Sequence, residues 1–397
     1  MSSSPINTTS PRMRLLWLEA SNYRSIGKDV RVHFCDLTAL VGPNGAGKSN
    51  VLDVARFLRE ALTLGLEPAI SRRLGIARLR RSSPTTPYSV KVSVGVADST
   101  GAEWGYYIQI DGARHGTYVL NYEELWHRPA GAPELREILH VSKGNVTLAP
   151  EGLAPRGSAE ELVLPSVAGH PMVKPLIDFL RNIRIHSIFP RDLAAPQAVG
   201  TRPPLDDTGT NWCAALKALP PQATAELELA LARITDEITG VRVDATGGYY
   251  VAEFRHEIDG SVRWFNAAQE SDGTLRLAGI LTGLLQDPPP PLIAIEEPEL
   301  TINPGLLPLI FDYLEAASDR TQVVITTHSP ELLDMLDVDA LRVVRRAEGA
   351  TQVMMVSPEQ RSLVRDALAS PGEILRTGGF TIENEGTSLA QLVGSDQ

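Results

Sequence analysis

Two kinds of hydrophobic pattern divide this chain. Towards the C-terminus, short apolar runs alternate with amphipathic stretches of helical period. The apolar runs are Leu292–Ile295, Gln322–Thr327 and Leu341–Val344, and the helical stretches are Gly305–Ala316 and Pro330–Leu336. Strands that are buried on both faces read as continuous apolar runs, so this region predicts a parallel sheet covered by helices.

The preceding region follows a different period. Tyr88–Asp98 alternates polar and apolar residues, and further strands follow after glycine-containing turns, which predicts an antiparallel layer. Those strands are Trp104–Ile110 and Thr117–Trp126, and a smaller β-rich patch is Val241–Val243, Tyr249–His256 and Val262–Asn266. Helices are predicted at Val173–Ile183, Gly209–Leu219, Gln222–Thr239 and Thr274–Leu285, whereas Ala130–Ala168 is predicted to be mostly loop.

A glycine-rich sequence lies between an apolar strand and an apolar helical run. It reads LVGPNGAGKSNVL and matches the pattern G-x-x-x-x-G-K-[ST]. The matching residues and the one that follows are Gly42, Pro43, Asn44, Gly45, Ala46, Gly47, Lys48, Ser49 and Asn50. Glycines let backbone N–H groups surround a phosphate chain, and the helix N-terminus adds partial positive charge. We therefore expect Lys48 to reach the β- and γ-phosphates of a nucleotide and Ser49 to bind Mg²⁺. The alternative is a glycine-rich turn that binds nothing.

Carboxylates follow the apolar strand Leu292–Ile295. They are Glu296 and Glu297, with Glu299 close behind. In doubly wound sheets the chemistry lies beyond the carboxyl ends of the strands, so these acids should lie near the glycine-rich loop. We expect Glu296 to bind Mg²⁺ through its water shell and Glu297 to polarise the water that attacks the γ-phosphate. The alternative is an exposed acidic turn.

The next apolar strand, Val323–Thr327, ends in His328. A histidine in this position can hydrogen-bond a γ-phosphate and sense its loss. A histidine with a purely structural role is the alternative.

A second candidate anion site lies at the start of the predicted helix Thr274–Leu285. Ser271 and Gly273 provide a hydroxyl group and a glycine at this helix N-terminus, which favours anion binding. The glycine-rich loop already surrounds the phosphates from one side, so this helix end makes best sense against the nucleotide of another subunit. A plain helix cap is the alternative.

In this order, the motifs resemble those of ABC-type ATPases of the SMC/RecF class. They look most like the stand-alone AAA-type ATPases related to the OLD (overcoming lysogenisation defect) family. The matching stretches are LEASNYRSI, VHFCDLTALVGPNGAGKSNVLD, SDGTLRLAGIL, LIAIEEPEL and VVITTHSPELLD. The resemblance covers roughly residues 18–53 and 270–345, a little under a third of the chain.

This resemblance implies an α/β fold of the P-loop NTPase class, of ABC/SMC-head type. The fold would have a mostly parallel sheet core, an antiparallel β layer and a helical signature subdomain. It also implies an ATPase that uses ATP and Mg²⁺ and forms a head-to-tail homodimer, in which Ser271 and Gly273 contact ATP held by the other protomer. Glu297 would be the catalytic base and His328 the switch histidine, and Arg24 would lie near the nucleotide.

Three differences from the family's motifs restrict which of its members this chain resembles. Glu296 stands where ABC proteins usually have aspartate, and Asp272 stands where transporters have glycine, which argues against a transporter. The sequence after Leu300 reads TINP, where relatives often have a histidine before the proline. No sustained heptad pattern separates Lys48 from Ser271, so no long coiled coil is expected.

Too few residues follow His328 for a Toprim nuclease domain, so a nuclease or Toprim-like effector is expected on a separate chain. The expected division is a disordered tail at 1–12 and an N-terminal ATPase lobe at 13–200. A helical signature subdomain at 201–290 and a C-terminal ATPase lobe at 291–397 are expected to follow.

Composition changes this picture mainly through charge. The formal net charge is −11, so the molecule as a whole should repel nucleic acid. Ser71–Arg81 nevertheless holds five arginines, which predict either a phosphate-contacting surface or a solvated face. The chain lacks a secretory signal pattern and an apolar stretch of membrane-spanning length, so a cytoplasmic protein without a membrane partner is expected.

The leading hypothesis is a cytoplasmic ATPase that dimerises on ATP and gates a nucleic-acid-related activity. Phage defence with a separate effector is the expected setting. One alternative is a RecF-like repair ATPase that binds DNA directly through Arg72, Arg73, Arg78, Arg80 and Arg81. The other is a nucleotide-gated scaffold that does not hydrolyse ATP.

Overall fold

A computed structural model of the chain describes residues 11–82, 89–112, 116–234 and 237–382. The chain forms two compact units, each described here by itself. The parallel-sheet unit comprises Ser25–Arg56 and Ile183–Gln397, and the antiparallel unit comprises Met1–Arg24 and Phe57–Asn182. The predicted disordered tail lies outside the described residues except for its last two positions.

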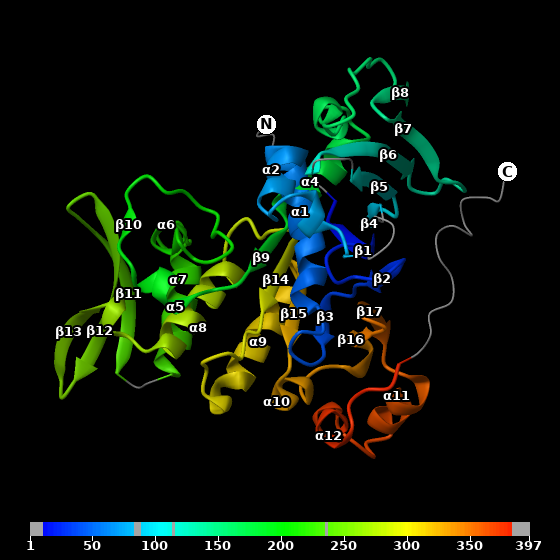
Figure 1. Cartoon of the computed structure of the whole chain (residues 1–397). Coiled ribbons are helices and arrows are strands. Elements are labelled where there is room, and N and C mark those ends of the chain that lie inside the picture. Colours follow the sequence, from blue (N-terminus) through cyan, green and yellow to red (C-terminus); the bar gives the residue numbers. More distant parts are fainter. Residues whose placement is uncertain (1–10, 83–88, 113–115, 235–236, 383–397) are drawn as a thin grey trace, which may run out of the picture. The chain divides into compact units, whose positions relative to one another are not determined.

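A six-stranded sheet forms the centre of the parallel-sheet unit, in the order β17-β16-β3-β15-β14-β9 (Figure 1). Its strands are β3 (Leu37–Val41), β9 (Arg184–His186), β14 (Leu292–Glu296), β15 (Gln322–Thr327), β16 (Leu341–Ala347) and β17 (Ala350–Met355). All neighbours are parallel except β16 and β17. Every residue of β15 is buried, as its continuous apolar pattern predicts.

Three central strands end at the same level. Thr326 of β15 lies opposite Glu296 of β14 on one side and Leu40 of β3 on the other. The residues that follow β3, β15 and β14 therefore leave the sheet at one edge. This register places the glycine-rich loop beside the segment after β15, which in turn lies beside the segment after β14 (Figure 1).

Helices complete this unit. They are the start of α1 (Lys48–Leu64), α5 (Pro190–Ala194), α6 (Trp212–Lys217), α7 (Pro221–Ala232), α8 (Asp272–Leu284), α9 (Leu307–Ser318), α10 (Pro330–Leu333), α11 (Pro358–Arg365) and α12 (Pro371–Thr377). Helix α8 is buried from Thr274 to Leu284, because it packs against α5, α6, α7, α9 and β14. Its mostly apolar sequence reflects burial on all sides rather than an amphipathic surface position.

A smaller sheet lies in the same unit and corrects one prediction. It contains β10 (Gln197–Ala198), β11 (Ile238–Thr246), β12 (Tyr249–Ile258) and β13 (Ser261–Asn266). Strand β2 (Val30–His33) is not part of this sheet but belongs to the same unit. The helix predicted at Gln222–Thr239 ends at Ala232, and Ile238 begins β11 instead. Ile238 continues the apolar spacing of the helix, but Thr239 and Gly240 have low helix propensity.

The antiparallel unit contains a sheet in the order β1-β4-β5-β6-β7-β8. Its strands are β1 (Met13–Ser21), β4 (Val90–Asp98), β5 (Glu103–Gly112), β6 (Tyr118–Arg128), β7 (Arg136–Ser142) and β8 (Asn145–Leu148). Its helices are the end of α1, α2 (Leu66–Ser71), α3 (Ile76–Leu79) and α4 (Lys174–Asn182).

Ala130–Ala168 is mostly loop, as expected, but it also contains β7 and β8, which the sequence analysis did not predict. A register shift where β6 faces β7 places Leu125 opposite Leu139 but Trp126 opposite Glu137. The extra residue, Ile138, puts two apolar residues side by side and interrupts the period-two pattern that would have revealed the strand. Within the described residues, no helix combines the length and the apolar character needed to cross a bilayer.

Candidate active site

The glycine-rich loop joins β3 to α1, and two of its glycines are required by close contacts. A Cβ on Gly42 would lie 2.0 Å from the carbonyl oxygen of Val344, and one on Gly47 would lie 2.2 Å from Oγ1 of Thr351. Gly45 has a positive φ of 77° but faces open space. Pro43, Asn44, Gly45 and Ser49 are exposed, whereas Ala46 is buried. The loop thus packs against Val344 and Thr351 on one side, while Pro43, Asn44 and Gly45 are exposed to solvent.

Hydrogen bonds that link Thr351, Ser25 and Asn50 hold the loop in place. Thr351 Oγ1 lies 2.7 Å from the Ala46 carbonyl oxygen, to which it donates, and 2.7 Å from Ser25 Oγ. Asn50 donates from Nδ2 to Ser25 Oγ at 2.6 Å. Thr351 and Ser25 were not predicted to belong to the site. Thr351 belongs to no motif, so its contact follows from tertiary structure alone.

Lys48 begins helix α1 and points back over the loop. Its Nζ donates to the carbonyl oxygens of Gly42 at 2.7 Å and Pro43 at 3.3 Å. Burial lowers the pKa of Lys48, and the charges of Glu297 and Glu299 oppose this. The ammonium group therefore lies where a loop-bound anion would contact it, close enough to these two acids to feel their charge.

Glu297 directly follows β14 with a backbone φ of 46°, a value unusual for a residue with a side chain. Its N–H donates to the carbonyl oxygen of Thr326 at 3.0 Å and to its Oγ1 at 3.1 Å. Its carbonyl oxygen accepts from Arg276. Non-glycine residues persist in this conformation when their surroundings over-determine it, and such outliers cluster at functional sites.

Arg276 of α8 contacts the end of β14. Its Nη2 donates to the carbonyl oxygens of Glu296 at 2.9 Å and Glu297 at 3.0 Å, and its Nη1 donates to that of Ile188. The side chain is buried, which lowers its pKa, while the three nearby glutamates oppose this shift. Sequence reasoning assigned Arg276 no role, although a lone charge in an apolar helix was a usable signal.

His328 lies beside two of the acids. Its Nδ1 is 3.5 Å from Glu297 Oε1 and 3.6 Å from Glu299 Oε1. Glu299 Oε1 accepts from the Thr327 hydroxyl at 2.7 Å and from the His328 N–H at 3.1 Å. Glu299 Oε2 is buried and has no hydrogen-bond partner among the described residues. Strands β14 and β15 end at the same edge of the sheet, so Glu297 and His328, which follow them, lie close together.

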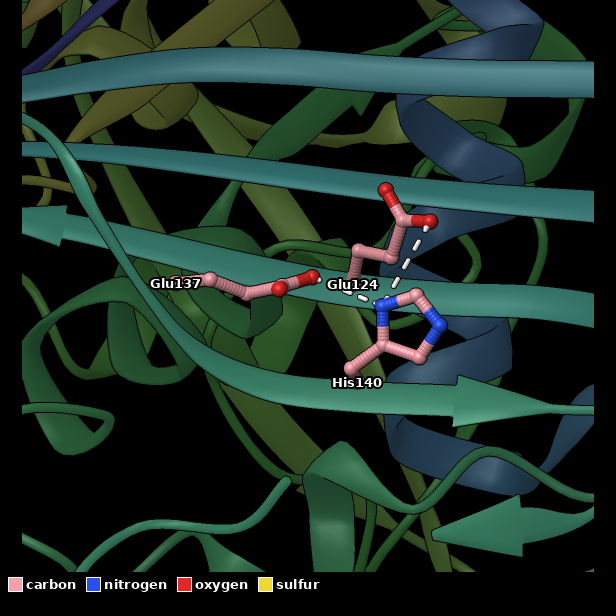
Figure 2. A group of neighbouring side chains, drawn as sticks. All are labelled: Glu124, Glu137 and His140. Atoms are coloured by element: carbon pink, nitrogen blue, oxygen red, sulfur yellow. Dashed lines mark hydrogen bonds and ion pairs between the residues drawn. The ribbon is translucent and has the colours of Figure 1, made fainter. Parts of the chain in front are cut away.

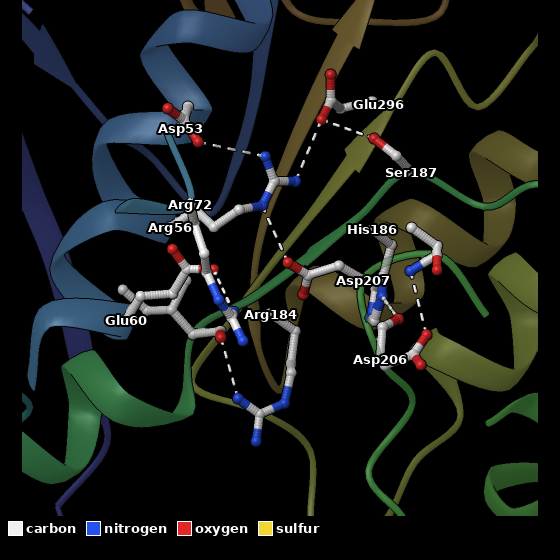
Figure 3. A network of polar contacts seen from close by, with 12 residues as sticks. Asp53, Arg56, Glu60, Arg72, Arg184, His186, Ser187, Asp206, Asp207 and Glu296 are labelled. Atoms are coloured by element: carbon white, nitrogen blue, oxygen red, sulfur yellow. Dashed lines mark hydrogen bonds and ion pairs between the residues drawn. The ribbon is translucent and has the colours of Figure 1, made fainter. Parts of the chain in front are cut away.

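Glu296 takes part in a separate ionic network (Figure 3). Its Oε1 accepts from Ser187 at 2.7 Å and from Arg56 Nη2 at 3.3 Å, and Arg56 also contacts Asp207 at 2.9 Å and Asp53 at 3.7 Å. Burial lowers the pKa of Arg56, but the three carboxylates outweigh it and the pKa is raised. One oxygen of the predicted metal ligand is therefore engaged by neighbouring side chains, which the sequence did not indicate.

Ser271 and Gly273 lie at the start of α8, where Ser271 is exposed and Gly273 is half-buried. Ser271 Oγ accepts from the Thr274 N–H at 3.1 Å, so this residue is a helix N-cap. A Cβ on Gly273 would lie 2.8 Å from the carbonyl oxygen of Thr301, which explains the glycine. The hydroxyl group and the helix N-terminus are at the surface, while the rest of α8 is buried.

The remaining candidates lie in the antiparallel unit. Arg24 donates its backbone N–H to the Leu79 carbonyl oxygen at 2.7 Å, and its role near a nucleotide stays a prediction. Arg73 is buried and pairs with Glu60 at 2.6 Å, so it is not available to a phosphate. Arg72 pairs with the same carboxylate at 3.0 Å but is exposed (Figure 3).

Comparisons with known proteins identify a family and a fold. A profile of the family described as "AAA domain, putative AbiEii toxin, Type IV TA system" matches residues 37–129 and 176–334. A segment of 50 residues is 44% identical to structural maintenance of chromosomes protein 1 of Arabidopsis thaliana. That segment is 12% of this chain, and the match spans only 4% of the length of that relative.

Solved structures show the same fold. An Smc head bound to the C-winged helix domain of ScpA has a TM-score of 0.53 at 15% identity, over 88% of this chain and 99% of that chain. An Smc head domain with an extended coiled coil, bound to the C-terminal domain of ScpA from Pyrococcus furiosus, has a TM-score of 0.50 at 14% identity. This second match covers 90% of this chain and 99% of that one. The expected ABC/SMC-head fold is thereby confirmed, whereas the closer likeness to OLD-like ATPases stays a prediction.

Proposed function

We propose that this chain binds and hydrolyses ATP. The premise is that it belongs to the AAA-domain family described as a putative AbiEii toxin of type IV toxin–antitoxin systems. Members of the family and of the SMC-head fold are generally ATPases. The observation that carries the proposal is the register of β3, β15 and β14, which brings the glycine-rich loop, His328 and Glu297 to one edge of the sheet.

The loop supports the binding of a triphosphate. Pro43, Asn44 and Gly45 are exposed, and the buried Lys48 donates to the carbonyl oxygen of Gly42 beside them. In the proposed complex, backbone N–H groups of the glycine-rich loop and of the first turn of α1 surround the phosphates, and Lys48 contacts the β- and γ-phosphates in place of its two carbonyl partners. Mg²⁺ would neutralise phosphate charge, held by exposed Ser49 and, through water, by Glu296.

Hydrolysis needs a group that orients and deprotonates water. In the proposed mechanism Glu297 accepts the proton of the water that attacks the γ-phosphate, and its backbone, held by Thr326 and Arg276, fixes the carboxylate position. His328, 3.5 Å from Glu297, contacts the γ-phosphate and reports its release. The nearby carboxylate of Glu299 holds the backbone of His328 in place.

Glu297→Gln tests this mechanism directly. Glutamine keeps the size of the side chain but cannot accept the proton, so we expect ATP turnover to fall by about 10² to 10⁴-fold while ATP affinity is retained. Steady-state phosphate release and nucleotide titration measure the two quantities. Unchanged turnover would favour a nucleotide-gated scaffold that does not hydrolyse ATP.

The exposed start of α8 supports a second part of the proposal. Ser271 and Gly273 would bind the γ-phosphate of ATP held by a second copy of the chain, giving a head-to-tail homodimer with two ATP molecules between the copies. This helix N-terminus begins at the exposed Ser271, while the loop of the same chain already has Lys48 and its own helix N-terminus. ATP would then act as the bridge between copies.

A matched pair of cap variants tests the dimer. Ser271→Ala and Ser370→Ala each remove an N-cap serine, because Ser370 Oγ accepts from the Glu373 N–H as Ser271 Oγ does from Thr274. Each should cost about 1 kcal/mol of stability. In a Glu297→Gln background, we expect only Ser271→Ala to prevent the mass increase on adding ATP. ATP-independent mass of the parent protein would refute the dimer.

The finer proposal is that this ATPase gates a nucleic-acid-related activity of a separate effector chain, a nuclease or Toprim-like protein, in phage defence. Its support is the family description, which names a toxin of a toxin–antitoxin system. Affinity capture by the Glu297→Gln protein, with ATP and with ADP, tests it. We expect a nuclease-type protein to be captured with ATP only, and identical captures under both conditions would contradict the gating.

A further inference from the structure

A group of three potential metal ligands lies on the antiparallel sheet and includes none of the residues assigned a role above. It consists of Glu124 on β6 with Glu137 and His140 on β7 (Figure 2). Nδ1 of His140 lies 2.8 Å from Glu137 Oε1 and 3.9 Å from Glu124 Oε1. The three ligand atoms lie within 4.8 Å of one another, and each side chain is partly exposed.

The strand register explains why these side chains meet. His140 and Glu124 are direct cross-strand partners, so they lie on the same face of the sheet. Glu137 is three residues before His140, which in a regular strand would place it on the opposite face. The register shift at Leu125/Trp126 pairs Glu137 with Trp126, two residues beyond Glu124, and returns it to the shared face. Two paired strands, rather than loops, therefore hold all three ligands.

The spacing fits a small cation. With metal–ligand bonds of about 2.0 Å, two ligands of a tetrahedral zinc ion lie about 3.3 Å apart. The distances of 2.8 and 3.9 Å from His140 Nδ1 bracket that value, so small side-chain rotations suffice. The two carboxylate oxygens lie within 4.8 Å of each other, and a cation between them would offset the repulsion of their negative charges.

Another histidine in the chain shows what a non-chelating arrangement looks like. His256 has Glu270 2.8 Å from its Nε2 and Glu237 3.8 Å from its Nδ1. Its two carboxylates therefore face different ring nitrogens and cannot join one ring nitrogen around a single ion. At His140 both carboxylates face the same nitrogen, as a shared ion requires.

We propose that Glu124, Glu137 and His140 form a zinc site that joins β6 to β7. One imidazole and two carboxylates are a ligand set that suits Zn²⁺, and a water molecule would complete the tetrahedron. The site is independent of the ATP site, since none of its residues takes part in nucleotide chemistry.

Zinc titration of the full chain, without nucleotide, tests the proposal. Wild-type protein should bind one more equivalent of Zn²⁺ than His140→Ala, and Co²⁺ should give the absorption of a tetrahedral site that the variant lacks. Glu124→Gln should weaken this site at least about tenfold. His140→Cys, which supplies a thiolate ligand, should keep the site, and His256→Ala should match wild type.

The following results would contradict a zinc site at Glu124, Glu137 and His140. Equal stoichiometry and affinity in wild type and His140→Ala would overturn the proposal, as would an equal loss in His256→Ala. Binding that requires millimolar Zn²⁺ would also overturn it, leaving the three side chains as a surface hydrogen-bonded group. Circular dichroism of each variant confirms that the sheet is intact.

Discussion

Arg276 donates a hydrogen bond from Nη2 to the carbonyl oxygen of Glu297 at 3.0 Å. This contact joins α8, the helix capped by Ser271, to the residue proposed to activate water. The backbone of Glu297 is held from the other side by Thr326, which fixes its φ of 46°. A shift of α8 would therefore move the proposed catalytic carboxylate, which offers a direct route from the proposed dimer contact to the proposed hydrolysis.

Replacement of Arg276 tests this coupling. Arg276→Met leaves the carbonyl oxygens of Ile188, Glu296 and Glu297 without their donor, so we expect a loss of about 2 kcal/mol or more in stability. ATP turnover should fall at least about tenfold, with nucleotide affinity nearly unchanged because Lys48 is untouched. Arg320→Met is the matched control, since Arg320 also donates to a main-chain carbonyl, that of Leu284. Equal turnover in the two variants would contradict the coupling.

Two loop glycines should differ in what alanine costs. Gly45→Ala incurs only the strain of a positive φ, about 1 kcal/mol, because nothing lies within 4 Å of the added Cβ. Gly47→Ala must also displace Thr351, which adds about 1–3 kcal/mol and breaks the hydrogen bond to Ala46. Urea denaturation without nucleotide measures both costs. A Gly47→Ala protein as stable as Gly45→Ala would show that Thr351 does not restrain the loop.

Glu299 is predicted to act through His328 rather than on the substrate. Glu299→Ala removes the acceptor of the Thr327 hydroxyl and the His328 N–H, so we expect turnover to fall about tenfold. Glu299→Gln keeps one acceptor oxygen and should retain most activity. Phosphate release at saturating ATP compares the two. Wild-type turnover in Glu299→Ala would exclude a positioning role.

A buried carboxyl group predicts how the stability of the antiparallel unit changes with pH. Glu123 is fully buried and accepts hydrogen bonds from the Tyr106 hydroxyl and from the N–H groups of Val163 and Leu164. Burial raises the pKa of Glu123 from 4.5 to about 7, although these three hydrogen bonds oppose the rise. Between these two values the folded state retains a proton that the unfolded state has lost.

The stabilising contribution of this proton is therefore complete below about pH 4.5 and is lost as the pH rises to about 7. The shift corresponds to about 3 kcal/mol. Glu123→Gln, which does not titrate, should lack this change. We expect the stability difference between wild type and variant to shrink across this range in thermal melts. A constant difference would refute the assignment, and exposed Glu160→Gln serves as the control.

The local sequence determined most of the elements around the site. The apolar run Val323–Thr327 and the acids after Ile295 predicted the strands and their ends, because burial on both faces leaves an uninterrupted apolar pattern. Helix α1 (Lys48–Leu64) follows the glycine-rich loop directly, as the apolar helical run after that loop predicts. The P-loop pattern needed no tertiary information, because spacing along one turn defines it.

Only the tertiary structure decided which distant groups complete the site. Thr351 lies far along the chain from Gly47, and no spacing rule connects them, yet it supports the loop. The partners of Arg276 are carbonyl oxygens, which every residue carries, so no sequence pattern could mark them. The bulge beside Ile138 hid β7 from a period-two reading and brought Glu137 to His140, because one extra residue reverses the face of every side chain beyond it.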